Sequence, residues 1–202
     1  MSSTNRGYNR HETDYYVTPQ DCIKQFFGEW LGDLMGEFHD DQLGVGTDPD
    51  KVLWLDPCAG GDANNKMSYP EVIKQEFGAD AMTIDIRQDS LAEIKQDYFL
   101  TEIKEPRPQV IITNPPFYLA QEIIEKALED VAENGYVVML LRLNFFGSNA
   151  RFPFWEKQLP VWAYIHHRRM SFTPNGKTDS IEYMHAVWQK GNSPAFTMTK
   201  VI

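Results

Sequence analysis

The run Asn114-Pro115-Pro116-Phe117 places an amide, two rigid residues and an aromatic ring directly after an apolar stretch, Val110–Thr113. The Asn114 side-chain oxygen and the Pro115 carbonyl can accept hydrogen bonds from both N–H bonds of an exocyclic amine, which directs the nitrogen lone pair toward an electrophile. The prolines fix these acceptors at little entropy cost. Phe117 can stack on the planar group that carries the amine. Since the proton can leave after the amine has become cationic, this chemistry needs no strong base.

Acidic side chains follow two other apolar stretches. Asp56 comes after Val52–Leu55 and leads into a glycine-rich turn, and Asp85 comes after Ala81–Ile84. Ligands of doubly wound sheets bind outside the carboxyl ends of the strands, and Asp85 stands about where an acid would reach ribose hydroxyls. A lone glycine-rich turn does not distinguish NAD from other adenosyl ligands, and a structural role for either acid stays open.

The alternation of apolar and polar stretches predicts helices and strands in turn. The expected helices are Thr18 to about Met35, Ser68 to near Gly78, Leu91–Lys95 and Ala120–Ala132. The expected strands are Val52–Leu55, Ala81–Ile84, Val110–Thr113, Tyr136–Leu143, Val161–Ile165, Ile181–Gln189 and Ala195–Val201. Ser68 and Glu71 have the spacing of a capping box, and Gly135 is expected to close the helix before it.

This order predicts an α/β fold with a mostly parallel, doubly wound sheet. Gly191–Ser193 would turn strand Ile181–Gln189 back into strand Ala195–Val201, which gives an antiparallel strand pair at the C-terminal edge.

Length and composition indicate one globular domain. The chain has 202 residues, of which 42% are hydrophobic, enough for a substantial core. We expect residues 1–12 to form a flexible tail and residues 13–202 a single catalytic domain. The start of the chain lacks the apolar region of a signal peptide, and no apolar run is long enough to span a membrane. Two cysteines, Cys22 and Cys58, make neither a disulfide framework nor a zinc pattern, so a cytoplasmic setting without a metal is expected.

Charge is unevenly distributed along the chain. Residues 1–141 hold 11 Lys/Arg and 26 Asp/Glu, whereas residues 142–177 hold six Lys/Arg and one Asp/Glu. This second segment also contains several aromatic residues, a combination that suits a polyanion. Solvated surface loops would give the same pattern, so both interpretations stay open.

Several motifs together resemble amino methyltransferases that depend on S-adenosylmethionine, most typically DNA adenine-N6 methyltransferases of the compact, phage-type group. The four residues from Asn114 resemble the catalytic motif, and Asp56-Pro57-Cys58-Ala59-Gly60 resembles the cofactor loop. Asp14-Tyr15-Tyr16-Val17-Thr18-Pro19 resembles the N-terminal cofactor motif. The resemblance covers about residues 12–190 and implies a Rossmann-like class I methyltransferase fold.

The resemblance also implies which residues form the site. Asn114, Pro115, Pro116 and Phe117 would be catalytic. The cofactor would be held by Tyr15, Tyr16, Thr18, Pro19, Asp56, Pro57, Cys58, Ala59, Gly60, Asp85, Ile86, Asp97, Tyr98 and Asn114. Phosphates would be held by Arg142, Arg151, Arg168, Arg169 and Lys177, with Phe172 or Phe146 against a flipped base. His166 and His167 are expected to be ordinary strand-end residues instead of bases or metal ligands.

One position departs from the family pattern. Asp62 stands where the cofactor loop usually has its last glycine, and its side chain could crowd or repel the methionine carboxylate. The expected function is methyl transfer to adenine N6 in DNA. The alternatives are methylation of adenine in RNA or of glutamine in protein, and a degenerate protein that binds the cofactor without turnover.

Because little chain lies between the motifs, we expect no separate target-recognition domain. Sequence choice would then come from loops 144–155 and 166–180, from a second copy of the chain, or from a partner protein. We therefore expect a nucleic-acid partner, DNA before RNA, no membrane partner, and a homodimer or a specificity subunit as the source of further contacts.

Overall fold

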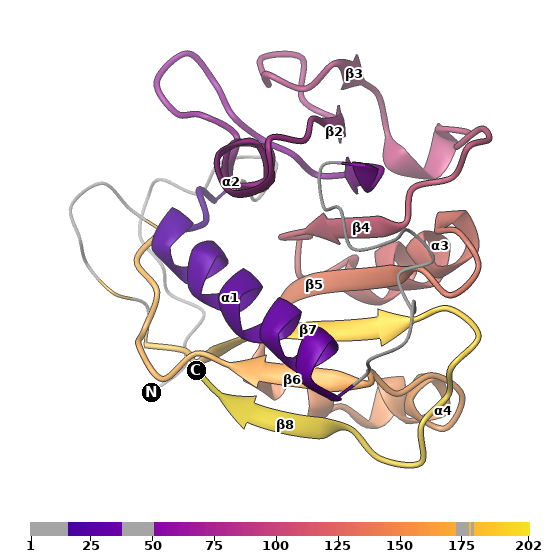
Figure 1. The fold of residues 1–202 in the computed structure, drawn as a ribbon. Coiled ribbons are helices and arrows are strands. Elements are labelled where there is room, and N and C mark those ends of the chain that lie inside the picture. The colour runs from indigo at the N-terminus through magenta and orange to yellow at the C-terminus, as the bar shows by residue number, and fades with distance from the viewer. Residues whose placement is uncertain (1–15, 38–50, 173–177, 179) are drawn as a thin grey trace.

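A computed structural model describes residues 16–37, 51–172, 178 and 180–202. The described strands form one eight-stranded sheet in the order β3-β2-β1-β4-β5-β7-β6-β8, with helices on both faces (Figure 1). The strands are β1 (Trp54–Asp56), β2 (Ala81–Asp85), β3 (Ile94–Lys95), β4 (Val110–Thr113), β5 (Tyr136–Arg142), β6 (Trp162–Ile165), β7 (Tyr183–Gln189) and β8 (Met198–Val201). The helices are α1 (Gln20–Glu37), α2 (Ser68–Phe77), α3 (Ala120–Asp130) and α4 (Phe152–Trp155), with short 3-10 turns η2 (Tyr98–Leu100), η3 (Leu143–Phe146) and η4 (Asn149–Arg151).

The sheet is parallel except for one strand. β7 runs antiparallel to both of its neighbours, β5 and β6, and all other described pairs are parallel. The expected α/β class, the mostly parallel sheet and the presence of an antiparallel strand pair are confirmed. The expected hairpin between the last two strands is wrong, because β5 and β6 already occupy both hydrogen-bonding edges of β7. β8 instead passes to the outer edge of β6 and pairs with it in parallel.

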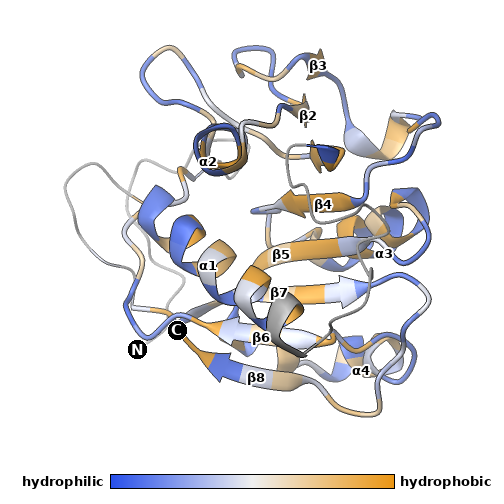
Figure 2. Ribbon diagram, viewed as in Figure 1, coloured by the Kyte–Doolittle hydropathy of each residue, from blue (hydrophilic) through white to orange (hydrophobic). Residues whose placement is uncertain are grey.

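Apolar side chains on the two faces of the sheet make two cores. On one face, Ile23, Phe26 and Trp30 of α1 pack with α2 against the central strands. On the other face, Ile123, Ile124 and Ala127 of α3 pack against the same strands. β5 is buried on both sides, which explains its uninterrupted apolar sequence. Figure 2 shows β4 and β5 as hydrophobic over most of their length, as strands covered on both faces must be.

Three local predictions are wrong for physical reasons. Leu91–Lys95 is not a helix, because Leu91 and Glu93 donate to Gly60 O and Thr83 Oγ1 and Ile94 pairs with β2. Ser68 is not a helix cap, since Met67 takes that position and makes no side-chain capping bond. Gly135 lies beyond the end of α3 at Asp130. Its lack of a side chain instead permits close packing, because a Cβ there would lie 2.7 Å from Gln109 O.

Candidate active site

A cavity of about 180 Å³ lies at the carboxyl ends of β1, β2 and β4. The strand-terminal residues Asp56 and Asp85 and the following Asn114 all line it, as the sequence predicted from their positions. The rest of the lining comes from Tyr16, Thr18, Pro57, Cys58, Ala59, Ser68, Tyr69, Ile86, Arg87, Asp97, Tyr98, Phe99, Pro116, Tyr118, Leu119 and Ile123.

The turn after β1 follows the wall of the cavity because hydrogen bonds tie it to β2. Ala59 N donates to Ile84 O at 2.9 Å, and Gly60 N donates to Asp85 Oδ2 at 2.8 Å. Gly60 and Gly61 have φ values of 67° and 74°, which side chains rarely tolerate. A Cβ on Gly61 would also lie 2.8 Å from Met67 Cγ. Glycine is therefore required at position 61 both for conformation and for space.

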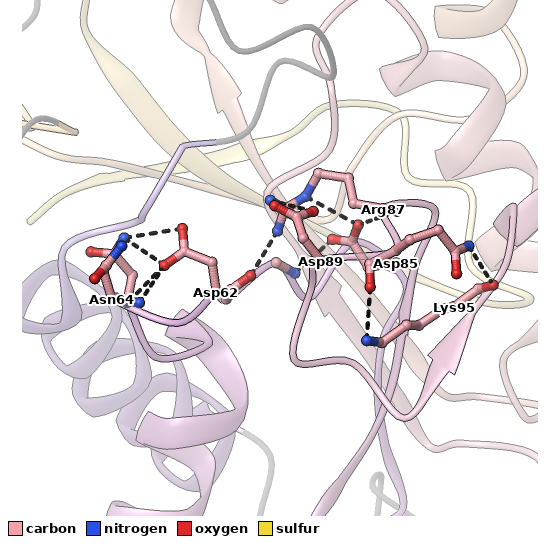
Figure 3. A network of polar contacts seen from close by, with 10 residues as sticks. Asp62, Asn64, Asp85, Arg87, Asp89 and Lys95 are labelled. Carbon is pink, nitrogen blue, oxygen red and sulfur yellow. Dashed lines mark hydrogen bonds and ion pairs between the residues drawn. The ribbon is translucent and has the colours of Figure 1, made fainter.

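Asp85 organises the adjacent wall through a buried ion pair. Its Oδ1 accepts from Arg87 N at 2.8 Å and lies 3.3 Å from Arg87 Nε (Figure 3). The Arg87 Nη2 donates to Gly61 O at 2.8 Å, so the arginine joins the end of β2 to the glycine turn. The side chains of Arg87 and Asp85 are only 4% and 8% exposed. Sequence reasoning missed Arg87, although a cation two residues after a strand-terminal acid could have suggested the pair.

Asp62 does not enter the cavity. Its carboxylate accepts hydrogen bonds from Asn64 N and Asn65 N at 2.7 and 2.9 Å, and from Asn65 Nδ2 at 3.0 Å (Figure 3). These bonds hold the pKa of Asp62 below its ordinary value, so the carboxylate stays ionised within its own loop. The residue that departs from the family pattern thus stabilises the turn between β1 and α2 instead of lining the cavity.

Asp56 is the most deeply buried acid of the cavity, with 1% of its surface exposed. Its Oδ1 accepts from Cys58 N at 3.1 Å. Burial raises the pKa of Asp56 from 3.8 to about 7, and the nearby charge of Asp85 adds to the shift. A group that titrates near neutral pH therefore lies in the cavity wall.

This shift predicts how stability depends on pH. The folded state holds the Asp56 proton more tightly than the unfolded state does, so the resulting stabilisation is fully present below the ordinary pKa and is lost as pH rises through about 7. In urea unfolding at about pH 5 and about pH 8, wild type should lose more stability over this interval than Asp56→Asn, whose amide does not titrate. Equal losses in both proteins would contradict the assignment.

Asn114 stands at a junction between two cavities. Together with Tyr16 it lines the large cavity and also a small one that is completed by Phe117, Phe172 and Tyr183. Asn114 Nδ2 donates to Thr18 Oγ1 at 3.1 Å, which leaves Oδ1 as the atom available to accept from a ligand. An amine bound in the small cavity and hydrogen-bonded to Asn114 Oδ1 would lie next to the large cavity.

We call the small cavity the aromatic slot. Phe172 and Tyr183 meet edge to face with ring centroids 5.0 Å apart, and Tyr183 and Phe117 are 5.9 Å apart. The Arg142 guanidinium carbon lies 4.4 Å from the Phe117 ring centroid, a cation–π arrangement. At about 10 Å³ the slot has room for one water, so a planar ring enters only if one of its side chains turns aside.

The other residues expected to be catalytic or to bind the cofactor differ in whether they line a cavity. Pro116 lines the large cavity, whereas Pro115 is buried and lines neither cavity. Asp97 accepts from Phe99 N at 2.9 Å and begins the 3-10 turn that carries Tyr98 past the cavity. Pro19 precedes α1 and does not line the cavity, and Gly60 takes part only through its bond to Asp85. Tyr15 lies outside the described residues.

The residues expected to bind phosphates have different partners and different exposure. Arg151 donates to Phe145 O and stacks on the Phe145 ring at 4.1 Å, whereas Arg168 is exposed. Arg169 is exposed and lies 3.4 Å from Glu182. Lys177 lies outside the described residues. Phe146 packs on Trp155 near α4 instead of reaching the slot, so several aromatic residues of the basic segment belong to the core.

No helix in residues 16–37, 51–172 and 180–202 is long and apolar enough to cross a membrane. Within the same ranges no three His, Cys, Asp or Glu side chains come together as metal ligands would.

Comparisons with known proteins place the fold. No protein-family model and no curated protein matches the sequence. A Pyrococcus horikoshii structure, provisionally named as an RNA methyltransferase, matches with a TM-score of 0.61 at 14% identity over 93% of this chain and 94% of that chain. A Listeria monocytogenes structure, provisionally named as a class I S-adenosylmethionine-dependent methyltransferase, gives 0.60 and 13% over 92% of this chain and 65% of that chain.

A third similar structure is the type IIG restriction endonuclease BpuSI, with a TM-score of 0.52 and 13% identity over 89% of this chain and 26% of that one. This chain thus spans less than two thirds of the Listeria protein and about a quarter of the endonuclease. At these identities the likeness concerns the fold, which is the Rossmann-like fold of class I methyltransferases.

Proposed function

We propose that this protein transfers a methyl group from S-adenosylmethionine to an exocyclic amine, with adenine N6 in DNA as the target. The observation that carries the proposal is the position of Asn114, which lines both the large cavity and the aromatic slot. A methyl donor in the first and a planar amine in the second would meet at this residue. Because Asn114 Nδ2 donates to Thr18 Oγ1, the Oδ1 atom would be the one that accepts from such an amine.

The large cavity suits the donor by its chemistry. Asp85 and Asp97 offer carboxylate acceptors for hydroxyl or ammonium groups, and Pro57, Cys58 and Ala59 of the turn after β1 line the cavity beside them. Tyr118, Leu119 and Ile123 give apolar surface for a planar ring. Bound there, S-adenosylmethionine would supply an electrophilic methyl group on a sulfonium.

The chain's own residues would act by positioning and electrostatics. Asn114 Oδ1 accepts one N–H bond of the amine, which orients the nitrogen lone pair toward the large cavity. The amine, once it had taken the methyl group from a donor held in the large cavity, would lose a proton to water. The Pro115 carbonyl would be the second acceptor if the chain relaxes around the substrate. The aromatic slot would hold the base, which must leave a duplex to enter it.

A second candidate substrate is adenine in RNA. The same amine and ring would fit, and the Pyrococcus neighbour carries an RNA methyltransferase name. The +5 charge of residues 142–177 favours either nucleic acid over a protein substrate.

The substrate can be identified with methyl-labelled S-adenosylmethionine. The purified protein is incubated with unmethylated duplex DNA, single-stranded DNA, RNA and a protein extract, and incorporated label is counted in each. Label in DNA supports the proposal, label in RNA alone selects the second candidate, and label in protein points to a glutamine amide. No label in any of them, with no cofactor binding by calorimetry, would refute the proposed activity.

The aromatic slot gives a prediction for substrate binding. Phe117→Ala should raise the KM for nucleic acid by roughly 5- to 100-fold, because stacking on a base is worth about 1–3 kcal/mol. The affinity for S-adenosylmethionine should not change, since Phe117 does not line the large cavity. Phe196→Ala is the matched control, because that ring is 73% exposed and lies outside both the slot and the basic segment 142–177. Equal KM values in the two variants would remove Phe117 from substrate binding.

A further inference from the structure

Arg142 lies against a wall of the aromatic slot instead of on the open surface. Its guanidinium carbon is 4.4 Å from the centroid of the Phe117 ring, well within the range of a cation–π contact. Arg142 is half-buried, and its Nε is shut off from solvent without a hydrogen-bond partner in the part of the chain that the structure describes. Within those residues, the ring of Phe117 is therefore the group that holds this guanidinium.

The antiparallel pairing of β5 with β7 places Arg142 beside the slot. Arg142 is the last residue of β5 and stands directly opposite Tyr183, the first residue of β7. Side chains of directly opposed residues lie on the same face of an antiparallel pair. Phe117, in the segment between β4 and α3, contacts both, since its ring centroid is 5.9 Å from that of Tyr183. The two strand residues thus support the Phe117 ring together.

The guanidinium covers a part of Phe117 that does not face the slot. Phe117 and Tyr183 line the slot, whereas Arg142 does not. A planar ring has two faces, and the cation lies over one of them. A base that enters the slot would therefore stack on the part of Phe117 that the guanidinium leaves open. Because the ring is held before the base arrives, less conformational freedom is lost on binding.

A phosphate contact would require Arg142 to leave this place. Arginine binds phosphate best through two parallel N–H bonds of its planar fork, and burial of Nε withdraws one edge of that fork from solvent. Arg168 is exposed, and Arg169 is exposed beside Glu182, so both present their guanidinium groups more openly. The burial of Arg142 and its stack on Phe117 favour a role through the ring over the phosphate contact that the sequence resemblance implied.

We infer that Arg142 is a positioning residue of the aromatic slot, which holds the Phe117 ring for stacking on the target base. This inference rests on the proposed function, because it requires a planar base in the slot. It goes beyond that function in naming the residue that orients the stacking ring. It also has a distinct consequence, since the contribution of Arg142 to binding then depends on the base and not on the backbone of the nucleic acid.

The first test separates base from backbone. The probe is a fluorescent single-stranded DNA with one central adenine among random C, G and T, and the matched probe has an abasic site at the centre. Binding is measured by fluorescence anisotropy with S-adenosylhomocysteine, so no methyl transfer is needed. Arg142→Met should weaken binding of the adenine probe by about 3- to 30-fold, the effect of losing a cation–π contact, and should leave binding of the abasic probe unchanged.

Two further variants show whether the effect passes through the ring. In a Phe117→Ala protein, the additional change Arg142→Met should weaken the adenine probe by less than about twofold, because no ring is left to hold. Arg107→Met is the matched control for the loss of a cation, since Arg107 precedes β4 and Asn114 follows that strand at its other end. Its affinity for both probes should equal that of wild type.

A phosphate contact would give a different pattern. Arg142→Met would then weaken both probes equally, with or without Phe117, and would reduce the slope of log Kd against log salt by about 0.7. That pattern would overturn the inference. Equal affinity of wild type for the two probes would also overturn it, because no base would then stack in the slot.

The second test needs no nucleic acid. If Arg142 and Phe117 support each other, their substitutions are not additive in the free protein. We expect the melting temperature of the double variant Arg142→Met/Phe117→Ala to lie about 1–8 °C above the value given by the sum of the two single shifts. Additive shifts would overturn the inference. If Arg142→Met does not fold, Arg142→Lys replaces it in both tests, because an ammonium keeps the charge but not the plane that lies on the ring.

The outcomes separate this inference from the proposed function. If wild type methylates DNA but Arg142→Met binds both probes as wild type does, the inference is overturned and the proposed function stands. If wild type methylates no substrate, the proposed function is refuted. The two tests require no methyl transfer, so they still decide whether Arg142 acts through Phe117.

Discussion

Replacing Asn114 by alanine should lower the rate of methyl transfer by about 100- to 1,000-fold, because it removes a pre-organised hydrogen-bond partner of the reacting amine. The side chain meets both cavities, and its amide is oriented by Thr18 before any substrate arrives. Since the catalytic contact is to the amine, the dissociation constant of S-adenosylmethionine should stay within about threefold of wild type. Single-turnover kinetics and calorimetry measure the two quantities separately.

Asn192→Ala is the matched control for this variant. Asn192 is an exposed amide just after β7, outside both loops expected to recognise the target, and it lines neither the large cavity nor the aromatic slot. Full activity in Asn192→Ala with loss in Asn114→Ala would assign the effect to the position of the amide. An Asn114→Ala protein that methylates at the wild-type rate would remove Asn114 from the mechanism, and one that no longer binds the cofactor would make it a binding residue.

Asp85→Asn should destabilise the protein by about 3–5 kcal/mol, because it leaves the buried Arg87 guanidinium without its charged partner. Both side chains of this pair are less than a tenth exposed, and Asp85 also accepts from the Gly60 N–H. For a chain of this size, the loss corresponds to a melting temperature lower by roughly 6–20 °C. Affinity for S-adenosylmethionine should fall as well, since Asp85 lines the large cavity and holds its glycine turn. Thermal unfolding and calorimetry measure the two effects.

Asp89→Asn is the matched control, because it removes the charge of an exposed partner of Arg87 instead of a buried one. Asp89 lies 3.5 Å from the same guanidinium, but its side chain is 64% exposed. Removing an exposed partner should cost less than about 1 kcal/mol. If Asp85→Asn and Asp89→Asn proved equally mild, the buried pair would not be what holds the turn after β1 against the end of β2.

The sequence predicted the fold where local pattern and long-range pairing agree. Val110–Ile112 and Tyr136–Leu141 are apolar and buried and form adjacent parallel strands at the centre of the sheet, and Asp56, Asp85 and Asn114 mark the strand ends that meet at one edge. These features could be predicted because the carboxyl ends of parallel strands converge wherever crossovers return the chain to the same side.

Prediction failed where distant parts of the chain decide the outcome. Met198–Val201 looks like a hairpin partner, and its actual place beside β6 depends on β7 being already paired on both edges. The aromatic slot joins Tyr16, Phe117, Phe172 and Tyr183 from four segments, and no local pattern links them. The sequence suggested that Asp62 could crowd or repel the cofactor. In the structure its carboxylate instead accepts from Asn64 N and Asn65 N, in a turn conformation that the residue types alone do not specify.

His166 and His185 are a further case in which the sequence did not predict a contact between distant segments. The sequence predicted His166 as an ordinary strand-end residue and indicated no role for His185. Antiparallel pairing of β6 with β7 brings the two histidines together, and His185 Nδ1 lies 2.7 Å from His166 Nε2. Tyr69 from α2 reaches His185 Nε2 at 2.9 Å, a contact that only the folded chain makes.

The measurement that tests the central claim most directly is the identity of the methylated atom. DNA treated with the protein and methyl-labelled S-adenosylmethionine is digested to nucleosides, and mass spectrometry and chromatography locate the label. The arrangement of Asn114 between the large cavity and the aromatic slot predicts label on an exocyclic nitrogen, recovered as N6-methyl-2′-deoxyadenosine, and loss of that label in Asn114→Ala. Label on a ring nitrogen, a carbon or an oxygen would contradict the account, as would unchanged labelling by Asn114→Ala.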